Sequence, residues 1–111
     1  MATTTNITIP LFNGSNYKQW STGMALLLEQ KKVWGIILGT KYKPVVPETD
    51  ATAAQLEKYS DWVELHGIAR STILLGLEPR LQSEYSAPSD AKELWTRLSN
   101  AYKANAYVAS I

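Results

Sequence analysis

Apolar residues recur at intervals of three and four along most of the chain, a pattern typical of amphipathic helices. Helices are expected over residues 17–31, 33–38 and 52–75, with a helical turn over 80–85 and a last helix starting at Ser89 or Asp90. Gly39, Gly76 and Pro79 are stop signals, and residues 13–16 and 41–50 are typical of turns and loops. The pattern predicts an all-α fold, a small bundle of four to six helices.

The two ends of the chain differ from this pattern. Residues 1–9 are rich in threonine with a brief alternation at Ile7 and Ile9, which predicts a short extended N-terminal arm or strand. Residues 10–111 form the predicted helical domain. Because no stop signal follows residue 105, we expect the chain to continue into a second domain.

Large aromatic residues dominate the predicted core. All four tryptophans lie within amphipathic patterns, and tryptophan buries a large apolar area. The long third helix is polar on its outer face at first and then becomes apolar all round, so its first half should be exposed and its second half central. The predicted core residues are Phe12, Tyr17, Trp20, Trp34, Trp62, Ile73, Trp95, Leu98 and Tyr102.

Little in the composition points to chemistry. The 111 residues include no cysteine and a single histidine, His66, which lies on an apolar stripe and is expected to be a half-buried structural residue. Serine-hydrolase elbows, phosphate-binding loops and dinucleotide motifs are missing from the sequence. We therefore expect no enzyme activity, no metal or other cofactor, and no small-molecule substrate.

Charge is unevenly distributed although the net charge is only +1. Residues 1–46 carry five lysines and one acidic residue. Among these, Lys31, Lys32, Lys41 and Lys43 surround Trp34 and Tyr42, a combination that can contact single-stranded RNA. Four lysines form a weak electrostatic footprint, so RNA binding by this segment is an alternative and not the main prediction.

One face of the first helix is unusual. Leu26 points away from the predicted core stripe and is flanked by Gln19, Thr22 and Gln30, with Gly23 at the edge. An apolar residue among uncharged polar groups, beside a glycine that permits close approach, is typical of a subunit interface. An isolated exposed leucine is also common on protein surfaces, and that interpretation stays open.

Two ordered motifs connect these features with a known family. The first is Phe-x-Gly-x-Asn-Tyr-x-x-Trp over residues 12–20, and the second is Ala-x-x-x-Trp-x-x-Leu-x-x-x-Tyr over residues 91–102. Between them lie Val-Trp-Gly-Ile-Ile-Leu-Gly at 33–39, Trp62, and Ile-Leu-Leu-Gly-Leu at 73–77. Over residues 10–105 the chain resembles the N-terminal part of Gag from copia-type LTR retrotransposons.

The resemblance implies a structural protein with a fold like that of retroviral capsid N-terminal domains. Many copies would assemble into virus-like particles around retrotransposon RNA in the cytoplasm, while the isolated domain would be monomeric or weakly associating. RNA would be bound mainly through other segments, because the zinc knuckle of the family requires cysteines. No membrane partner is implied. A host-domesticated Gag acting as a protein-interaction adaptor is the main alternative.

Overall fold

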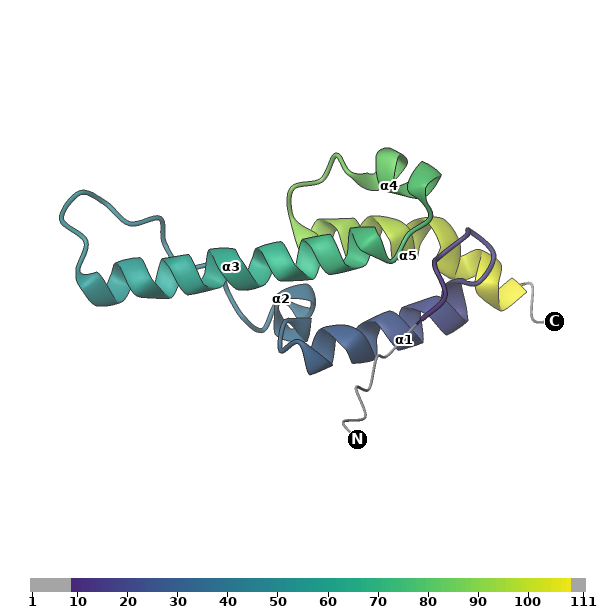
Figure 1. The fold of residues 1–111 in the computed structure, drawn as a ribbon, viewed down its shortest axis with the longest axis horizontal. Coiled ribbons are helices and arrows are strands. Elements are labelled where there is room, and N and C mark those ends of the chain that lie inside the picture. The colour runs from purple at the N-terminus through teal and green to yellow at the C-terminus, as the bar shows by residue number, and fades with distance from the viewer. Residues whose placement is uncertain (1–8, 109–111) are drawn as a thin grey trace, which may run out of the picture.

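Five helices make up the part of the chain that the structure describes. The computed structural model describes the backbone of residues 9–108 and the side chains of residues 9–103. The helices are α1 (Tyr17–Gln30), α2 (Trp34–Leu38), α3 (Ala53–Leu75), α4 (Pro79–Tyr85) and α5 (Ala91–Val108) (Figure 1). The prediction of an all-α bundle is confirmed for this part of the chain, with helix limits within two residues of those expected. Apart from Ile9, the expected N-terminal arm lies outside the described residues.

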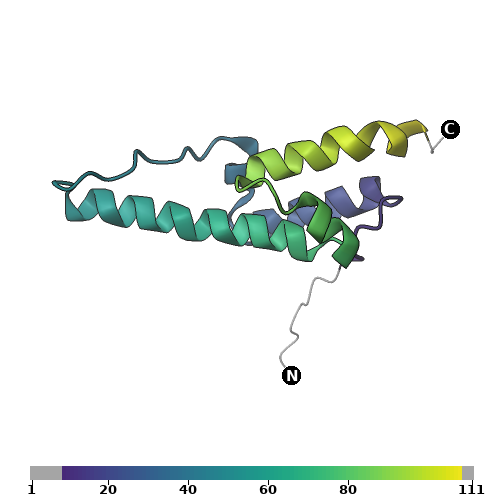
Figure 2. The same ribbon diagram turned by 90° about the horizontal axis from the view of Figure 1, so that it is seen from above.

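The long helix α3 belongs to the bundle with only one of its halves. Its C-terminal half packs among the other helices, and its buried residues, Ala69 and Ile73, both lie there. Its N-terminal half extends beyond the bundle, accompanied by the loop that joins α2 to α3 (Figures 1 and 2). The predicted change from an exposed first half to a central second half is therefore confirmed.

The centre of the core is an aromatic cluster around Trp20. Its indole ring lies 5.1 Å from the ring of Phe12 and 5.7 Å from that of Trp95, and its side chain is fully buried. The indole Nε1–H donates to the Gly76 carbonyl at 2.9 Å, and the Phe12 N–H donates to the same oxygen at 2.8 Å. With an isolated parallel bridge between Phe12 and Leu77, these bonds attach the N-terminal segment to the end of α3.

Most predicted core residues lie in or against this core. Those that are buried are Phe12, Tyr17, Trp20, Ile73 and Leu98, and those that are partly buried against it are Trp34, Trp95 and Tyr102.

The prediction that Trp62 belongs to the core is wrong. Trp62 is half-buried on the projecting half of α3, where its ring stacks on His66 at 4.6 Å and the Lys43 ammonium lies 5.6 Å from its centroid. The apolar stripe of α3 continues beyond the point where the neighbouring helices end, so periodicity alone does not show which turns are covered.

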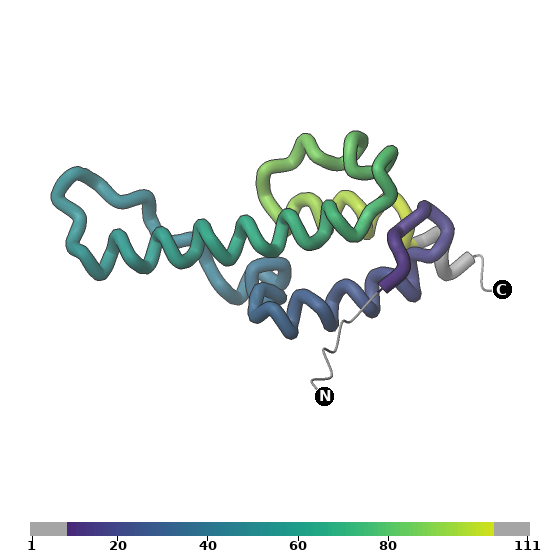
Figure 3. The backbone as a smooth tube through the Cα atoms, in the orientation of Figure 1, coloured from purple at the N-terminus to yellow at the C-terminus, as the bar shows by residue number. Residues whose placement is uncertain are grey.

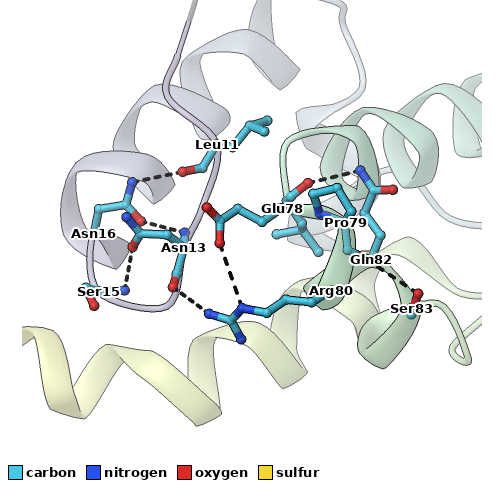
Figure 4. A network of polar contacts seen from close by, with 10 residues as sticks. Leu11, Asn13, Ser15, Asn16, Glu78, Pro79, Arg80, Gln82 and Ser83 are labelled. Carbon is cyan, nitrogen blue, oxygen red and sulfur yellow. Dashed lines mark hydrogen bonds and ion pairs between the residues drawn. The ribbon is translucent and has the colours of Figure 1, made fainter.

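The first aromatic motif owes its spacing to a compact loop ahead of α1 (Figure 4). The Asn16 side chain donates to the Leu11 carbonyl at 3.1 Å and accepts from the Asn13 N–H at 3.0 Å. Gly14 has φ +92°, a conformation that favours glycine, and Arg80 of α4 donates to the Asn13 carbonyl at 2.9 Å. Polar side chains thus hold the loop in the shape that directs Phe12, Tyr17 and Trp20 inward.

Candidate protein-interaction surface

An open groove of about 510 Å³ lies between α1, α2 and α5. It brings residues of the neighbouring helices α1 and α2 together with residues of α5, which is distant from them in sequence. The groove is lined by Tyr17, Lys18, Ser21, Thr22, Ala25 and Leu26 of α1, Trp34 of α2, and Trp95, Ser99 and Lys103 of α5.

Two tryptophans give this groove its apolar character. Trp34 meets Trp95 edge to face, with ring centroids 5.3 Å apart, and Trp95 in turn stacks on the buried Trp20. Both groove tryptophans are partly exposed while packing against the core. Because the core holds the rings in place, the groove presents a preformed aromatic surface.

The residues predicted as a subunit interface on α1 are exposed, and two of them border the groove. Thr22 and Leu26 line it, and Leu26 is 57% exposed. Gln19 and Gln30 are also exposed but do not line the groove.

Gly23, at the edge of this strip, packs against the N-terminal segment of its own chain. A Cβ atom at this position would lie 2.8 Å from Cγ2 of Ile9 in the same chain. Within the chain, the close approach that this glycine permits is therefore made by the N-terminal segment. A subunit contact at this edge of α1 stays a prediction.

The charge of the groove has one sign. Its charged lining residues are Lys18 and Lys103, both exposed. Tyr102, next to Lys103, contacts Phe12 ahead of α1, whereas Trp95 contacts Trp34 beyond the end of α1. The two helices are thus antiparallel, which places both lysines at one end of the groove and the tryptophan pair toward the other.

The loop over residues 39–52, which we call the proline loop, forms a second exposed surface. It runs back along the projecting half of α3 (Figure 3). Tyr42, Val45 and Val46 are 82%, 89% and 59% exposed, and the two valines stand between Pro44 and Pro47. Exposed apolar side chains in a proline-containing segment are a common feature of peptide recognition.

The four lysines considered for RNA contact lie on both sides of α2. Lys31 and Lys32 are exposed in the turn before this helix, and Lys41 and Lys43 are exposed in the proline loop after it. The Lys43 ammonium is engaged over the Trp62 ring at 5.6 Å from its centroid. Among the side chains of residues 9–103, no exposed stack of aromatic rings lies alongside all four lysines.

His66 has the half-buried position expected of a structural histidine. Its side chain is 15% exposed, and its Nε2 accepts a hydrogen bond of 3.0 Å from the N–H of Ala91, the first residue of α5. The Ala91 N–H needs an unprotonated Nε2, whereas Asp90 Oδ1, 3.3 Å from the same nitrogen, is engaged only by a protonated one. In either state His66 holds the start of α5 from a neighbouring helix. Asp90 adds a second cap by accepting from the Glu93 N–H at 3.2 Å.

Neither a metal centre nor a membrane span emerges from the described residues. Histidine and acidic side chains between residues 9 and 103 do not gather in a group able to hold a metal ion. Among the helices of the described chain, none is long and apolar enough to cross a membrane. The described residues also carry two exposed apolar surfaces, the groove and the proline loop.

Comparison with known families identifies the class. Residues 24–110 match the family described as gag-polypeptide of LTR copia-type, and the chain belongs to this family. The second aromatic motif lies within the matched residues, whereas the first precedes them. The searches of curated proteins and of solved structures found no match.

Sequence reasoning missed several residues of the two surfaces. Trp34 and Trp95 were predicted as core residues only, and Lys18, Lys103 and the valines of the proline loop were not singled out. A usable signal exists for Trp95, which follows the buried Leu94 by about 100° around the helix and so lies at one edge of the apolar stripe. Nothing in the sequence shows that α1 and α5 leave a groove between them.

Proposed function

We propose that this chain is the N-terminal lobe of a copia-type Gag capsid, which assembles with other copies into particles that enclose retrotransposon RNA in the cytoplasm. Membership of the Gag family is the observation that carries the proposal. The exposed groove and proline loop support it, since a shell requires surfaces that contact neighbouring copies. The lobe acts as a structural component and catalyses no reaction.

Small contacts suffice for this role. A shell repeats each contact many times, so a single contact can bury less than the roughly 1,000 Å² of a stable dimer. The isolated 111-residue chain should accordingly be a monomer or associate weakly. Light scattering that shows a tight oligomer of fixed size at micromolar concentration would contradict this part of the proposal.

Particle formation is the direct test. The complete open reading frame that contains these residues should form shells visible by negative-stain electron microscopy. Leu26→Asp places a charge at the border of the groove and should reduce the number of particles while the helical circular dichroism is unchanged. Leu56→Asp is the matched control, because Leu56 is similarly exposed at 51% but lies on α3, outside the groove lining.

The two variants separate the outcomes. Particles from the Leu26→Asp protein in normal numbers would remove the α1 strip from the proposed contacts. A complete protein that forms no shells under any condition, yet binds host proteins, would favour the domesticated adaptor.

A further inference from the structure

We propose that the groove between α1, α2 and α5 binds the proline loop of a second copy of this chain. This inference rests on the proposed capsid function and specifies one of its contacts. Both surfaces are exposed within a single chain. Both are apolar, and the groove is flanked by basic residues whereas the loop valines are followed by acidic ones.

The groove and the proline loop each expose apolar side chains that can pack against the other. The groove offers the partly exposed rings of Trp34 and Trp95, and the loop offers Val45 and Val46, which are 89% and 59% exposed. Segments that carry two prolines near one another favour an extended conformation, and grooves lined by aromatic rings bind such segments. Little conformational freedom would be lost on binding, because prolines already restrict the loop.

The charged residues of the two surfaces are opposite in sign. Lys18 and Lys103 are the charged residues of the groove, and both are basic. The loop carries Glu48 and Asp50 directly after its apolar segment. Of the two lysines in the loop, Lys43 lies over the Trp62 ring of the same chain, and Lys41 precedes the valines at the end of the loop next to α2. The charged loop residues that follow the valines are therefore acidic, opposite in sign to the groove.

The order of these groups along the two surfaces also agrees. In the groove, the tryptophan pair lies toward one end and the two lysines lie at the other. In the loop, the valines come first and the acidic residues follow within a few positions. An extended segment rises about 3 Å per residue, so valines seated on the tryptophans would place Glu48 toward the lysines. Asp50 stays close to Glu48, because the Ala51 N–H donates to the Glu48 carbonyl at 3.0 Å and closes a turn there.

A second copy must supply the loop. The proline loop runs along the projecting half of α3, away from the part of α5 that carries Lys103 (Figures 1 and 3). Within one chain the loop valines are exposed, so they do not occupy their own groove. A contact that joins two different surfaces is heterologous, and it leaves one free groove and one free loop for further copies.

Charge reversal tests this contact in the 111-residue chain. The groove variant is Lys18→Glu with Lys103→Glu, and the loop variant is Glu48→Lys with Asp50→Lys. All four side chains are exposed, so the fold should persist, which circular dichroism would verify. The matched control, Glu57→Lys with Asp61→Lys, reverses two exposed charges on α3 outside the groove.

Self-association is measured by the concentration dependence of amide and indole NMR shifts up to about 1 mM, the range of weak contacts. Each pair variant should associate at least about tenfold more weakly than the unmodified chain, because like charges then oppose each other. The chain that carries all four reversals should regain the self-association of the unmodified chain, because opposite charges face each other again. A mixture of the two pair variants should associate more strongly than either alone. The α3 control should behave like the unmodified chain.

Several results would overturn the proposal. These are a lack of shift changes at the Trp34 and Trp95 indoles in the unmodified chain, normal association of both pair variants, or no recovery in the fourfold variant. In the complete protein, normal particles from the groove variant would overturn this contact and leave the capsid function standing. A complete unmodified protein without particles would instead overturn the capsid function, and the NMR shifts would still decide the contact.

Discussion

Two tryptophans that look equivalent in the sequence should respond very differently to replacement by phenylalanine. Trp20 is fully buried, and its indole N–H donates to the Gly76 carbonyl at 2.9 Å. Trp62 lies on the projecting half of α3, and its enclosed Nε1 has no hydrogen-bond partner among the described residues. The same substitution thus removes a used donor at one position and an unused donor at the other.

The structure sets the size of each effect. Trp20→Phe loses one hydrogen bond, about 1 kcal/mol, while Gly76 keeps the bond from the Phe12 N–H and is not left unpaired. The cavity left by the smaller ring, roughly 40 Å³, costs about 1 kcal/mol more. Trp62→Phe weakens the contacts with His66 and Lys43 but removes an unsatisfied N–H. These effects oppose each other, so its net change should lie within about 0.5 kcal/mol of zero.

Thermal unfolding followed by circular dichroism distinguishes the two variants. For a domain of this length, about 1 kcal/mol corresponds to roughly 4 °C in Tm. Trp20→Phe should therefore lower Tm by about 8 °C, and Trp62→Phe by no more than about 2 °C. Equal decreases, or a larger decrease for Trp62→Phe, would refute the placement of Trp62 outside the core.

Three further predictions concern a titrating side chain and two helix ends. Burial, aided by a hydrogen bond with Tyr102, raises the pKa of Tyr85 from 10.0 to about 12; the folded state therefore favours the neutral phenol, and this contribution to stability is present below about pH 10 and is lost as the pH rises toward 12. Phenolate absorbance should show one late-titrating tyrosine that disappears in Tyr85→Phe, and its persistence there would reassign the shift. Thr52→Ala removes the side-chain oxygen that accepts from the Gln55 N–H at the start of α3, while the backbone N–H of residue 52 can still donate to Gln55 Oε1. The change should cost about 1 kcal/mol and give faster amide exchange in the first turns, and unchanged exchange would show that the cap is dispensable. Gly39→Ala should lower the urea-derived free energy of unfolding by about 1 kcal/mol, because Gly39 ends α2 with φ +81°, and an unaltered midpoint would contradict this.

The helices could be predicted from the sequence because each contains its own evidence. Leu94 and Leu98 recur at helical spacing, Gly39 ends α2, and Gly76 and Pro79 both follow the last residue of α3. The aromatic core could be predicted for the same reason, since burial of Trp20 follows from its place on a narrow apolar stripe. These features depend on local patterns that survive in any arrangement of the helices.

The groove and the environment of Trp62 could not be predicted in this way. Both depend on where one helix stops covering another, which is set by the crossing of α1, α3 and α5. Trp95 illustrates the limit: its place on the stripe indicates contact with the core, but not that one edge of the ring stays open beside Trp34. The contact of Ile9 with Gly23 could not be predicted either, because it depends on how the N-terminal segment folds back against α1.

The shared acceptor at Gly76 has a consequence for the order of folding. Phe12 and Trp20 both donate to this carbonyl, and Phe12 also contacts the ring of Tyr102 near the other end of the described chain. Phe12 and Trp20 thus find these partners only after the segments that carry Gly76 and Tyr102 have been made. Such non-local contacts form late, so the rings of Phe12 and Trp20 stay exposed on the nascent chain until residue 102 has been made. Until then, these two aromatic side chains are a site at which a chaperone would bind the nascent domain.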